Sequence, residues 1–226
     1  MITQRYTYTP CARETIDGKR HYCLPDGSKV ASVTTILDRT KSEESRAALA
    51  NWRKAVGDAK ATAITTEAAS RGTRLHKWLE NYVLSGEIAE PGTNPYSKQS
   101  WEMANQIITK GLIHATEFWG TEVPLYVSGL YAGTTDLVGT WKGKPAIMDF
   151  KQSNKVKKRE YIDDYFHQLA AYSLAHDEMY GTKIETGVIL MCTKDCEYLE
   201  FVIEGEEFKK YTAEWLNRVE DYYKLD

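Results

Sequence analysis

The chain has 226 residues, of which 42% are hydrophobic and 27% charged, with a formal net charge of −3. This length and composition suffice for one sizeable core and argue against two independent domains. The small negative charge excludes a global basic field of the kind that draws nucleic acid to a protein. The charge is unevenly spread, however, because residues 177–226 carry a net −7 and residues 1–176 a net +4. A local basic surface is therefore compatible with the small negative net charge of the whole chain.

The N-terminal half is predicted to contain short strands followed by helices. Strands are expected in residues 5–10 and 19–37, with the turn sequence PDGS inside the second stretch. A helix is expected in 40–57, with Thr40 and Glu43 at capping-box spacing and Gly57 as the stop. A second helix is expected in about 60–84 and a third in 97–119, after the loop EPGTNPYS.

In the C-terminal half, the predicted secondary structure changes from mainly helices to mainly strands. Three β-type runs, 121–128, 131–141 and 144–152, are separated by segments short enough for hairpin turns. The remaining predictions are a helix in 159–181, strands in 184–193 and 197–204, and a helix in 206–226. This order favours an α/β fold with a central mixed β-sheet flanked by helices and an N-terminal helical elaboration.

The clearest chemical pattern is a pair of acids on neighbouring strands. If the chain turns back after residue 141, residues 136–140 run antiparallel to 145–149, and the carboxylates of Asp136 and Asp149 approach each other. Two acids in one site repel unless a cation lies between them, and oxygen ligands suit hard ions such as Mg²⁺ or Mn²⁺. Lys151 shares the strand face of Asp149. The alternative for Asp149 and Lys151 is a strand-end salt bridge, although a second acid favours a catalytic pair.

Two further pairs stand at helical i,i+4 spacing. His76 and Glu80 share a helix face in RGTRLHKWLE, where the histidine is suited to ligate a metal and the glutamate to orient it or a water. The alternatives are a core or capping histidine and a solvated acid. Gln168 and Tyr172 are paired likewise, either to hydrogen-bond a phosphate or water or simply to pack. Glu122 either lines the cleft or is an ordinary exposed acid.

Taken together, YAGTTDLVG, AIMDFKQS and HQLAAY, preceded by RGTRLH and ASVTTIL, resemble the PD-(D/E)XK nuclease superfamily. The likeness is greatest to its RecB-like exonuclease branch, which includes Cas4 and the mitochondrial genome maintenance exonuclease. The resemblance implies a single nuclease domain over 1–226 with a restriction-endonuclease-like core. Its parts are an N-terminal region of about 1–118, a catalytic core of about 119–204 and a C-terminal helix of about 205–226.

The resemblance also implies Mg²⁺- or Mn²⁺-dependent cleavage of DNA. The implied metal ligands are His76, Asp136, Asp149 and the Phe150 main-chain carbonyl, with Lys151 acting on the water. Gln168 and Tyr172 hold the DNA or the site geometry. The substrate is expected to be single-stranded DNA or DNA ends, in replication, recombination, repair or phage DNA metabolism. A chain of this length has no room for a helicase, so the protein is expected to act either alone or beside a helicase, polymerase or recombination protein.

Basic residues near these motifs are candidates for DNA contacts. The residues considered are Arg71, Arg74, Lys155, Lys157, Lys158 and Arg159. Trp52 and Trp78 are suited to stack on bases, although core packing is favoured for both. The basic run from 155 is by default a solvated loop. The rival functions are a Cas4-like CRISPR adaptation nuclease, a structure-specific endonuclease and a non-catalytic DNA-binding module.

Four cysteines complete the inventory of reactive side chains. The N-terminus lacks a signal-peptide pattern and no segment is long enough to cross a bilayer, so a cytoplasmic protein of a bacterial or phage-infected cell, without disulfides, is expected. Cys11, Cys23, Cys192 and Cys196 could build a four-thiolate metal site, but no CxxC spacing is present and ordinary thiols are favoured. Iron–sulfur members of the branch place one cysteine before the core and three after it, so no cluster is expected here.

Overall fold

The computed structural model describes residues 1–225. The N-terminal part comprises β1 (Ala12–Ile16), β2 (Lys19–Cys23), β3 (Lys29–Ala31), α1 (Val33–Arg39), α2 (Glu43–Val56), α3 (Asp58–Ser85) and α4 (Pro95–Lys110). The C-terminal part comprises β4 (Ala115–Val127), β5 (Tyr131–Trp141), β6 (Lys144–Ser153), α5 (Asp163–Tyr180), β7 (Thr186–Thr193), β8 (Tyr198–Glu204) and α6 (Gly205–Lys224). Short 3₁₀ helices occupy Leu112–His114 and Arg159–Tyr161. None of the helices within the described residues is both long and apolar enough to cross a membrane.

Strands β4 to β8 form the central sheet, in sequence order across it. All neighbouring pairs are antiparallel except β6 and β7, which run parallel and are joined through α5. A parallel pair needs such a crossover, because its strands start at the same edge of the sheet. The sheet is therefore mixed, and the predicted fold class is confirmed. The three strands β1, β2 and β3 form a second, smaller antiparallel sheet.

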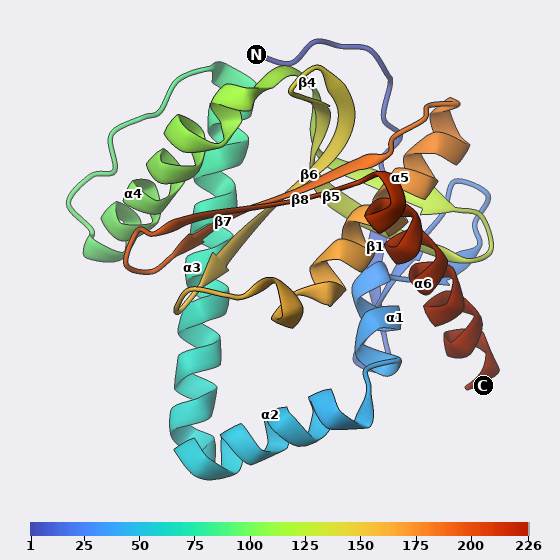
Figure 1. The fold of residues 1–226 in the computed structure, drawn as a ribbon, viewed down its shortest axis with the longest axis horizontal. Helices are drawn as coiled ribbons and strands as arrows, with labels where there is room; N and C mark the ends of the chain where they lie inside the picture. The colour runs from blue at the N-terminus through green and yellow to red at the C-terminus, as the bar shows by residue number, and fades with distance from the viewer. Residues whose placement is uncertain (226) are drawn as a thin grey trace.

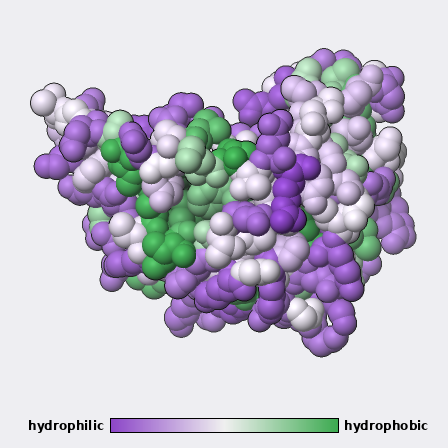
Figure 2. Space-filling view, turned by 90° about the horizontal axis from the view of Figure 1, so that it is seen from above, coloured by the Kyte–Doolittle hydropathy of each residue, from purple (hydrophilic) through white to green (hydrophobic). Residues whose placement is uncertain are grey.

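Helices cover both faces of the central sheet (Figure 1). On one face Leu75 and Leu79 of α3 and Ile107 of α4 pack with Met148 and other sheet residues. On the other face the helices α5 and α6 contribute Phe166 and other apolar residues to a second core cluster. Strand β7 is buried along its whole length, because both of its faces are covered. Seen from above, the outer surface is mostly hydrophilic, with hydrophobic residues gathered left of centre (Figure 2).

Four sequence predictions in the N-terminal half were wrong at the level of local structure. Residues 5–10 form no strand; their alternating tyrosines pack side chains on an aromatic cluster instead of pairing backbones. The segment 32–37 starts α1, because Ser32 caps it by accepting a hydrogen bond from the Thr35 N–H. Helix α2 is likewise capped by Ser42, and Thr40 instead ends α1. The predicted helix 97–119 ends at Lys110, and its last residues belong to β4.

The other predicted elements match the structure within a few residues. The stop at Gly57, the long helix α3 and all five strands of the central sheet are present. The C-terminal helix is present up to Lys224, and Asp226 of the predicted range lies outside the described residues.

Helix α2 stands apart from this core. None of its residues is buried, and it extends from α1 to α3 at the bottom of Figure 1. A cavity of about 570 Å³ lies where Trp52 of α2 and Ile64 of α3 face Tyr165 and the segment that follows β6. The helix therefore forms one wall of a cavity rather than part of the core.

The aromatic cluster on the N-terminal segment buries a histidine whose ionisation we expect to destabilise the fold in acid. His176 is fully buried, and its ring nitrogens lie 2.8 Å from the Thr182 hydroxyl and 3.2 Å from the Tyr8 hydroxyl. Burial lowers the pKa of His176 to about 4. The unfolded chain binds this proton near pH 6.5 and the native chain does not, so the contribution to stability is complete above pH 6.5. It is lost as the pH falls toward 4, by up to about 3 kcal/mol.

Urea unfolding at pH 7.5 and 4.5 measures this effect. We expect His176→Gln to lose less stability than wild type between the two pH values, because glutamine does not titrate. Equal losses in the two proteins would show that His176 is not the group responsible.

Candidate active site

The two acids of the sequence motif lie where β5 and β6 separate. The pairing of these strands runs from Trp141 opposite Lys144 to Leu137 opposite Met148 and then stops. Beyond this point β5 continues to pair with β4 and forms one isolated bridge from Ala132 to Ser32, while β6 continues to pair with β7. We call this point the fork. Asp136 and Asp149 are the first residues past the last pair, and both are buried.

At the fork, the side chain of Asp136 accepts a hydrogen bond that a paired strand's backbone carbonyl would otherwise accept. Its Oδ2 accepts a hydrogen bond of 2.7 Å from the Phe150 main-chain N–H. A buried N–H without an acceptor is costly, so the carboxylate is held in place by the backbone of β6. The second oxygen, Oδ1, lies 3.2 Å from the His76 Nδ1. The acid therefore links β5, β6 and α3.

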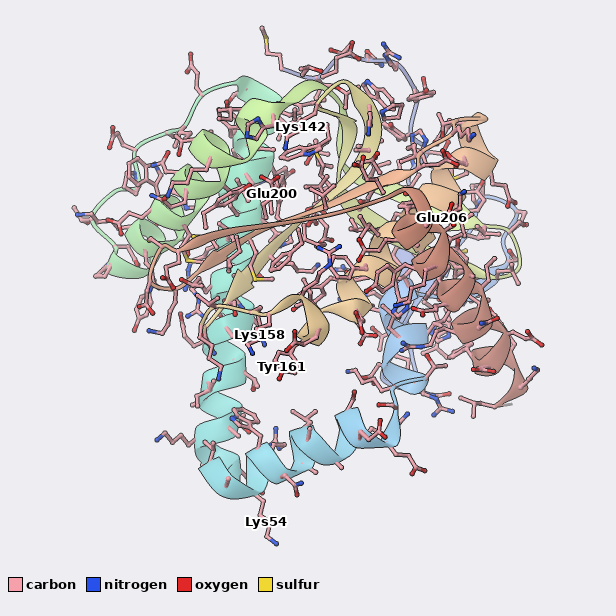
Figure 3. The ribbon with its side chains drawn as sticks, viewed as in Figure 1. Lys54, Lys142, Lys158, Tyr161, Glu200 and Glu206 are labelled. Carbon is pink, nitrogen blue, oxygen red and sulfur yellow. The ribbon has the colours of Figure 1, made fainter. Side chains whose placement is uncertain are left out.

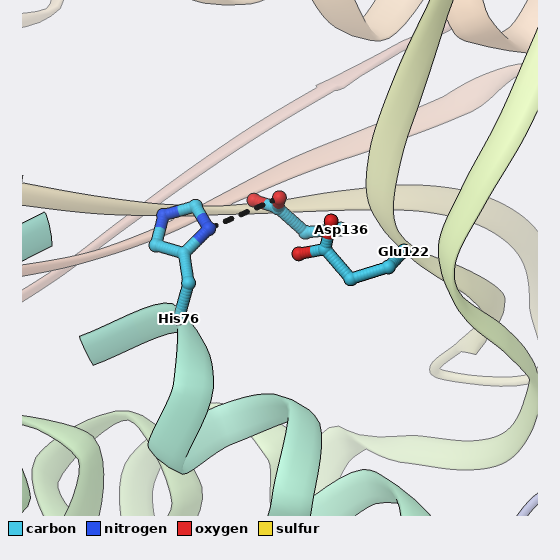
Figure 4. Close-up of side chains that lie close together, drawn as sticks. All are labelled: His76, Glu122 and Asp136. Atoms are coloured by element: carbon cyan, nitrogen blue, oxygen red, sulfur yellow. Dashed lines mark ion pairs between the residues drawn. The ribbon is translucent and has the colours of Figure 1, made fainter. Parts of the chain in front are cut away.

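His76, Glu122 and Asp136 form a compact group of ligand-type atoms (Figure 4). One ligand atom from each residue lies within 4.8 Å of the others. His76 follows the buried Leu75 on α3, so the packing of this helix on the sheet carries the imidazole to the fork. Glu122 lies on β4 between Thr121, which pairs with Leu137, and Val123. Its backbone has a φ of 50°, a left-handed value that non-glycine residues adopt at some energetic cost and often at functional sites.

The donor set fits a hard divalent cation. Carboxylate oxygens with one imidazole nitrogen suit Mg²⁺ or Mn²⁺ better than the soft thiolate-preferring metals. Part of the group is buried and part is accessible, since Asp136 is buried while Glu122 is exposed. A cation would also relieve the repulsion between the acids at the fork.

Metal binding is expected to raise the thermal stability of the protein. At a concentration about a hundredfold above the dissociation constant, binding to the native state alone adds about 2.7 kcal/mol. For a chain of this size that corresponds to a rise in Tm of about 5–10 °C. We expect this rise with Mg²⁺ or Mn²⁺ against EDTA, and its loss in Asp136→Asn. Glu90→Gln, at an exposed acid outside the site, is the matched control. An equal rise in both variants would exclude the site.

Lys151 lies beside the acids with its ammonium group held on three sides. Its Nζ is paired with the Asp149 carboxylate, donates to the Gln168 Oε1 at 3.2 Å, and lies 4.9 Å from the centre of the Tyr165 ring. The salt bridge that the sequence left as an alternative is thus present, next to a second buried acid, Asp136. The ion pair alone does not explain the presence of Asp136. The strand end therefore contains both the salt bridge and the second acid that favours a catalytic pair.

The ionisable groups at the fork are strongly perturbed in the metal-free protein. Burial raises the pKa of Asp149 to about 6, with Asp136 adding to the rise and Lys151 opposing it. Burial also acts to raise the pKa of Asp136, but His76, Lys151 and the Phe150 N–H outweigh it and hold the pKa below its usual value. For His76 burial acts to lower the pKa, but the contact with Asp136 outweighs it and raises the pKa to about 9. Perturbed groups clustered in this way are typical of functional sites.

The remaining residues of the predicted catalytic set lie close to the fork. Tyr172 is buried, and it lines one cavity with His76 and Asp136. A side chain at Gly133 would collide with its ring, because an added Cβ would lie 2.6 Å from Tyr172 Cε1. Glu80 is half-buried, and its Oε2 accepts a hydrogen bond of 2.9 Å from Lys77.

Three of the basic residues predicted to contact DNA are engaged with protein groups. Arg71 is buried and donates to Gln152 and Asn154. Arg74 pairs with Glu67 at 3.0 Å. Arg159 pairs with Glu207 at 2.6 Å.

The lysines of the basic run are less engaged with protein groups than these three arginines. Lys155 and Lys157 line the cavity with Trp52, and Lys158 is exposed with Glu160 3.8 Å away. Lys158 lies on the segment after β6, above α2 in the view of Figure 3. Trp78 is partly buried against the α3–α4 core. Lys155 and Lys157, with Trp52, therefore remain the best placed of this set for a ligand.

Some residues of the site were not identified from the sequence. Glu122 was left open between two roles, and Arg13 and Arg20, which line one cavity with His76 and Asp136, were not singled out. The only local signal for the arginines was their alternation with Thr15 and Tyr22 on a hairpin.

The cysteines lie in two places. Cys11 and Cys23 are at the N-terminal sheet, and Cys192 and Cys196 are at the β7–β8 turn; all are free thiols.

Comparison with known proteins points to exonucleases. No family model matches the chain. The mouse mitochondrial genome maintenance exonuclease 1 is 28% identical over 204 residues, which cover 86% of this chain and 59% of that protein. The human protein of that name is 25% identical, over 85% of this chain and 58% of its own. The chain thus spans about three fifths of the length of these curated relatives.

One solved structure, a candidate exonuclease from Eubacterium rectale, overlaps 68% of this chain and 64% of its own with a TM-score of 0.48 and 19% identity. The sequence similarity is thus to proteins named as exonucleases, and it does not single out the RecB-like branch.

Proposed function

We propose that this protein is a metal-dependent deoxyribonuclease that removes nucleotides from DNA by hydrolysing phosphodiester bonds. The observation that carries the proposal is the fork, where Asp136 and Asp149 meet His76 from a distant helix and Lys151 from the same strand. The similarity to proteins named as exonucleases agrees with it.

The proposed metal ligands are His76, Asp136, Asp149 and the Phe150 main-chain carbonyl, with Glu122 as an additional acid. A divalent cation held there supplies Lewis acidity toward a phosphate oxygen and lowers the pKa of a water molecule. Asp136 is kept ionised by His76 and the Phe150 N–H, which suits a permanent ligand.

Lys151 is the proposed electrostatic catalyst. Its ammonium is fixed by Asp149 and Gln168, so it needs no reorganisation when negative charge develops on the phosphate. From this position it orients the attacking water and stabilises the five-coordinate transition state. The water oxygen forms the new P–O bond, and the departing sugar oxygen takes up a proton as its bond to phosphorus breaks. Gln168 acts here by positioning Lys151, and Tyr172 shapes the cavity floor.

Single-stranded DNA or a DNA end is the proposed substrate. The cavity between α2, α3 and the end of β6 combines the aromatic rings of Trp52 and Tyr165 with the cations of Lys155 and Lys157. Aromatic rings stack on bases and lysines attract the phosphate backbone, which is how single strands are held without sequence preference. A role in replication, recombination, repair or phage DNA metabolism, beside a helicase, polymerase or recombination protein, follows from this activity.

Digestion of end-labelled linear single-stranded DNA tests the proposal. The assay is run in Mg²⁺, Mn²⁺ and EDTA, with a circular single strand as control. We expect metal-dependent shortening of the linear strand from one labelled end and no cleavage of the circle. Cleavage of the circle would indicate an endonuclease. Binding without cleavage in either metal would indicate a DNA-binding module and overturn the proposal.

A further inference from the structure

A second cavity borders the fork, and its chemistry differs from that of the cavity at α2. It has a volume of about 220 Å³, and His76, Glu122 and Asp136 form part of its lining. The rest of the lining comes from the small N-terminal sheet, the start of α1, β5 and Tyr172 of α5. It shares no residue with the cavity that contains Lys155 and Lys157. The first cavity adjoins the end of β6, and this one adjoins β5, so the two flank the fork.

Two arginines of the N-terminal sheet face this second cavity. Arg13 pairs across β1 and β2 with Tyr22, and Arg20 pairs with Thr15. Because side chains alternate along a strand, all four of these residues lie on one face of the sheet. Tyr22 is buried, and its hydroxyl lies 3.2 Å from the Thr134 hydroxyl of β5, so this is the face turned toward β5. Both arginines therefore line the cavity from this face.

The side chains of Arg13 and Arg20 lack ion-pair and hydrogen-bond partners among the described residues. Within residues 1–225 no carboxylate forms an ion pair with the side chain of Arg13 or Arg20, and neither side chain donates a hydrogen bond. By contrast, Arg71, Arg74 and Arg159 are all engaged with protein groups. Two unpaired arginines beside a cluster of acids are suited to an anion that approaches that cluster. Guanidinium groups bind phosphate through paired hydrogen bonds, which makes a phosphate the fitting ligand.

We propose that Arg13 and Arg20 bind the phosphate that neighbours the scissile one on the DNA strand, on the β5 side of the fork. This inference rests on the proposed function and adds the direction in which the strand crosses the site. The incoming strand contacts the cavity of Trp52 and Lys155, and the end to be released enters the arginine cavity. The bound group is either a terminal phosphate monoester or an internal phosphodiester.

The double variant Arg13→Gln/Arg20→Gln tests the inference. Both arginines are exposed, so we expect the variant to fold and to melt like wild type. Lys29→Gln is the matched control, because Lys29 lies on the opposite face of the same sheet, where it pairs with Glu14 at 2.6 Å. Binding of a 12-nucleotide single strand is measured by fluorescence anisotropy in Ca²⁺, and cleavage kinetics are measured in Mg²⁺.

We expect the double variant to bind DNA about tenfold or more weakly and to raise KM by a similar factor, with kcat nearly unchanged. The logarithm of affinity should also depend less steeply on the logarithm of salt concentration, by about 0.7 for each phosphate that the variant leaves unneutralised. Oligonucleotides with phosphate or hydroxyl ends distinguish the ligands. Weaker binding confined to phosphate-ended strands identifies a terminal monoester, and equally weakened binding for all ends identifies an internal phosphodiester.

Affinity and salt dependence equal to those of wild type and Lys29→Gln would overturn the inference. If wild type cleaves no DNA in any metal, the proposed nuclease function fails, but the binding measurement still decides the arginine site. Weaker binding of the double variant would then support a phosphate site on a DNA-binding protein.

Discussion

Asp149→Asn is expected to reduce metal-dependent DNA cleavage by about a thousandfold or more and, at the same time, to stabilise the metal-free protein at pH 8. The loss of activity follows from removing a charged oxygen ligand beside Asp136. The gain in stability follows from the pKa of Asp149, which burial raises to about 6. A carboxyl group whose native pKa is raised contributes stability that is complete below its unfolded pKa and is lost as the pH rises through 6. Wild type therefore carries the full cost of a buried charge at pH 8.

The size of this cost is about 1–3 kcal/mol at pH 8, from a rise of roughly two pKa units. An asparagine carries no charge, so the variant avoids the cost of a buried charge. Thermal melts in EDTA at pH 8 and pH 4.5 measure the effect, and the difference between the proteins should shrink at the lower pH. A variant less stable than wild type at pH 8 would mean that Asp149 serves the fold through its ion pair with Lys151. The cleavage assay reports the catalytic part separately.

Lys151→Met is expected to lower the cleavage rate by about a hundred- to a thousandfold while leaving the metal-induced rise in Tm intact. Methionine is of similar length and keeps the packing against Tyr165, but it removes the ammonium that Asp149 and Gln168 hold at the fork. The metal ligands are untouched, so binding of the cation should persist. Reduced cleavage with an unchanged rise in Tm would show that the lysine acts in catalysis, whereas the acids bind the metal.

The matched control for this variant is Lys194→Met, at an exposed lysine of the β7–β8 turn whose side chain pairs with Asp195. Rates are compared at saturating DNA and metal, so that binding effects are excluded. Undiminished cleavage by Lys151→Met would contradict the proposed role and leave the lysine as a structural partner of Asp149.

The two cavities at the fork connect these chemical predictions to substrate choice. One presents aromatic rings and lysines, and the other presents two arginines that form no ion pair within residues 1–225. On the proposed path, a strand that contacts both cavities passes the acids at the fork. End selection would then follow from the cavity that receives the released nucleotide, and the arginine variants test that step independently of the catalytic variants.

The sequence alone determined which segments of the C-terminal half form strands and which of these strands are joined by short turns. Hydrophobic alternation and glycine-containing turns are local properties, so they predicted β4, β5 and β6 and the antiparallel approach of Asp136 to Asp149. Local rules failed where tertiary contacts decided the conformation. Residues 5–10 alternate as a strand does, but Tyr6 and Tyr8 pack on Trp119 and His176 without strand pairing. The segment 32–37 is rich in β-branched residues, yet its apolar face and the Ser32 cap make it a helix.

The site shows the same division between local pattern and tertiary contact. Asp149 and Lys151 share a strand face by simple alternation, so their proximity was readable from the sequence. The unpaired state of Arg13, the burial of Arg71 and the left-handed backbone of Glu122 were not readable. Each depends on which segments, distant in sequence, pack around the side chain, and no local periodicity encodes that. The tertiary structure therefore decided which charged side chains pair with other protein groups and which remain available to a ligand.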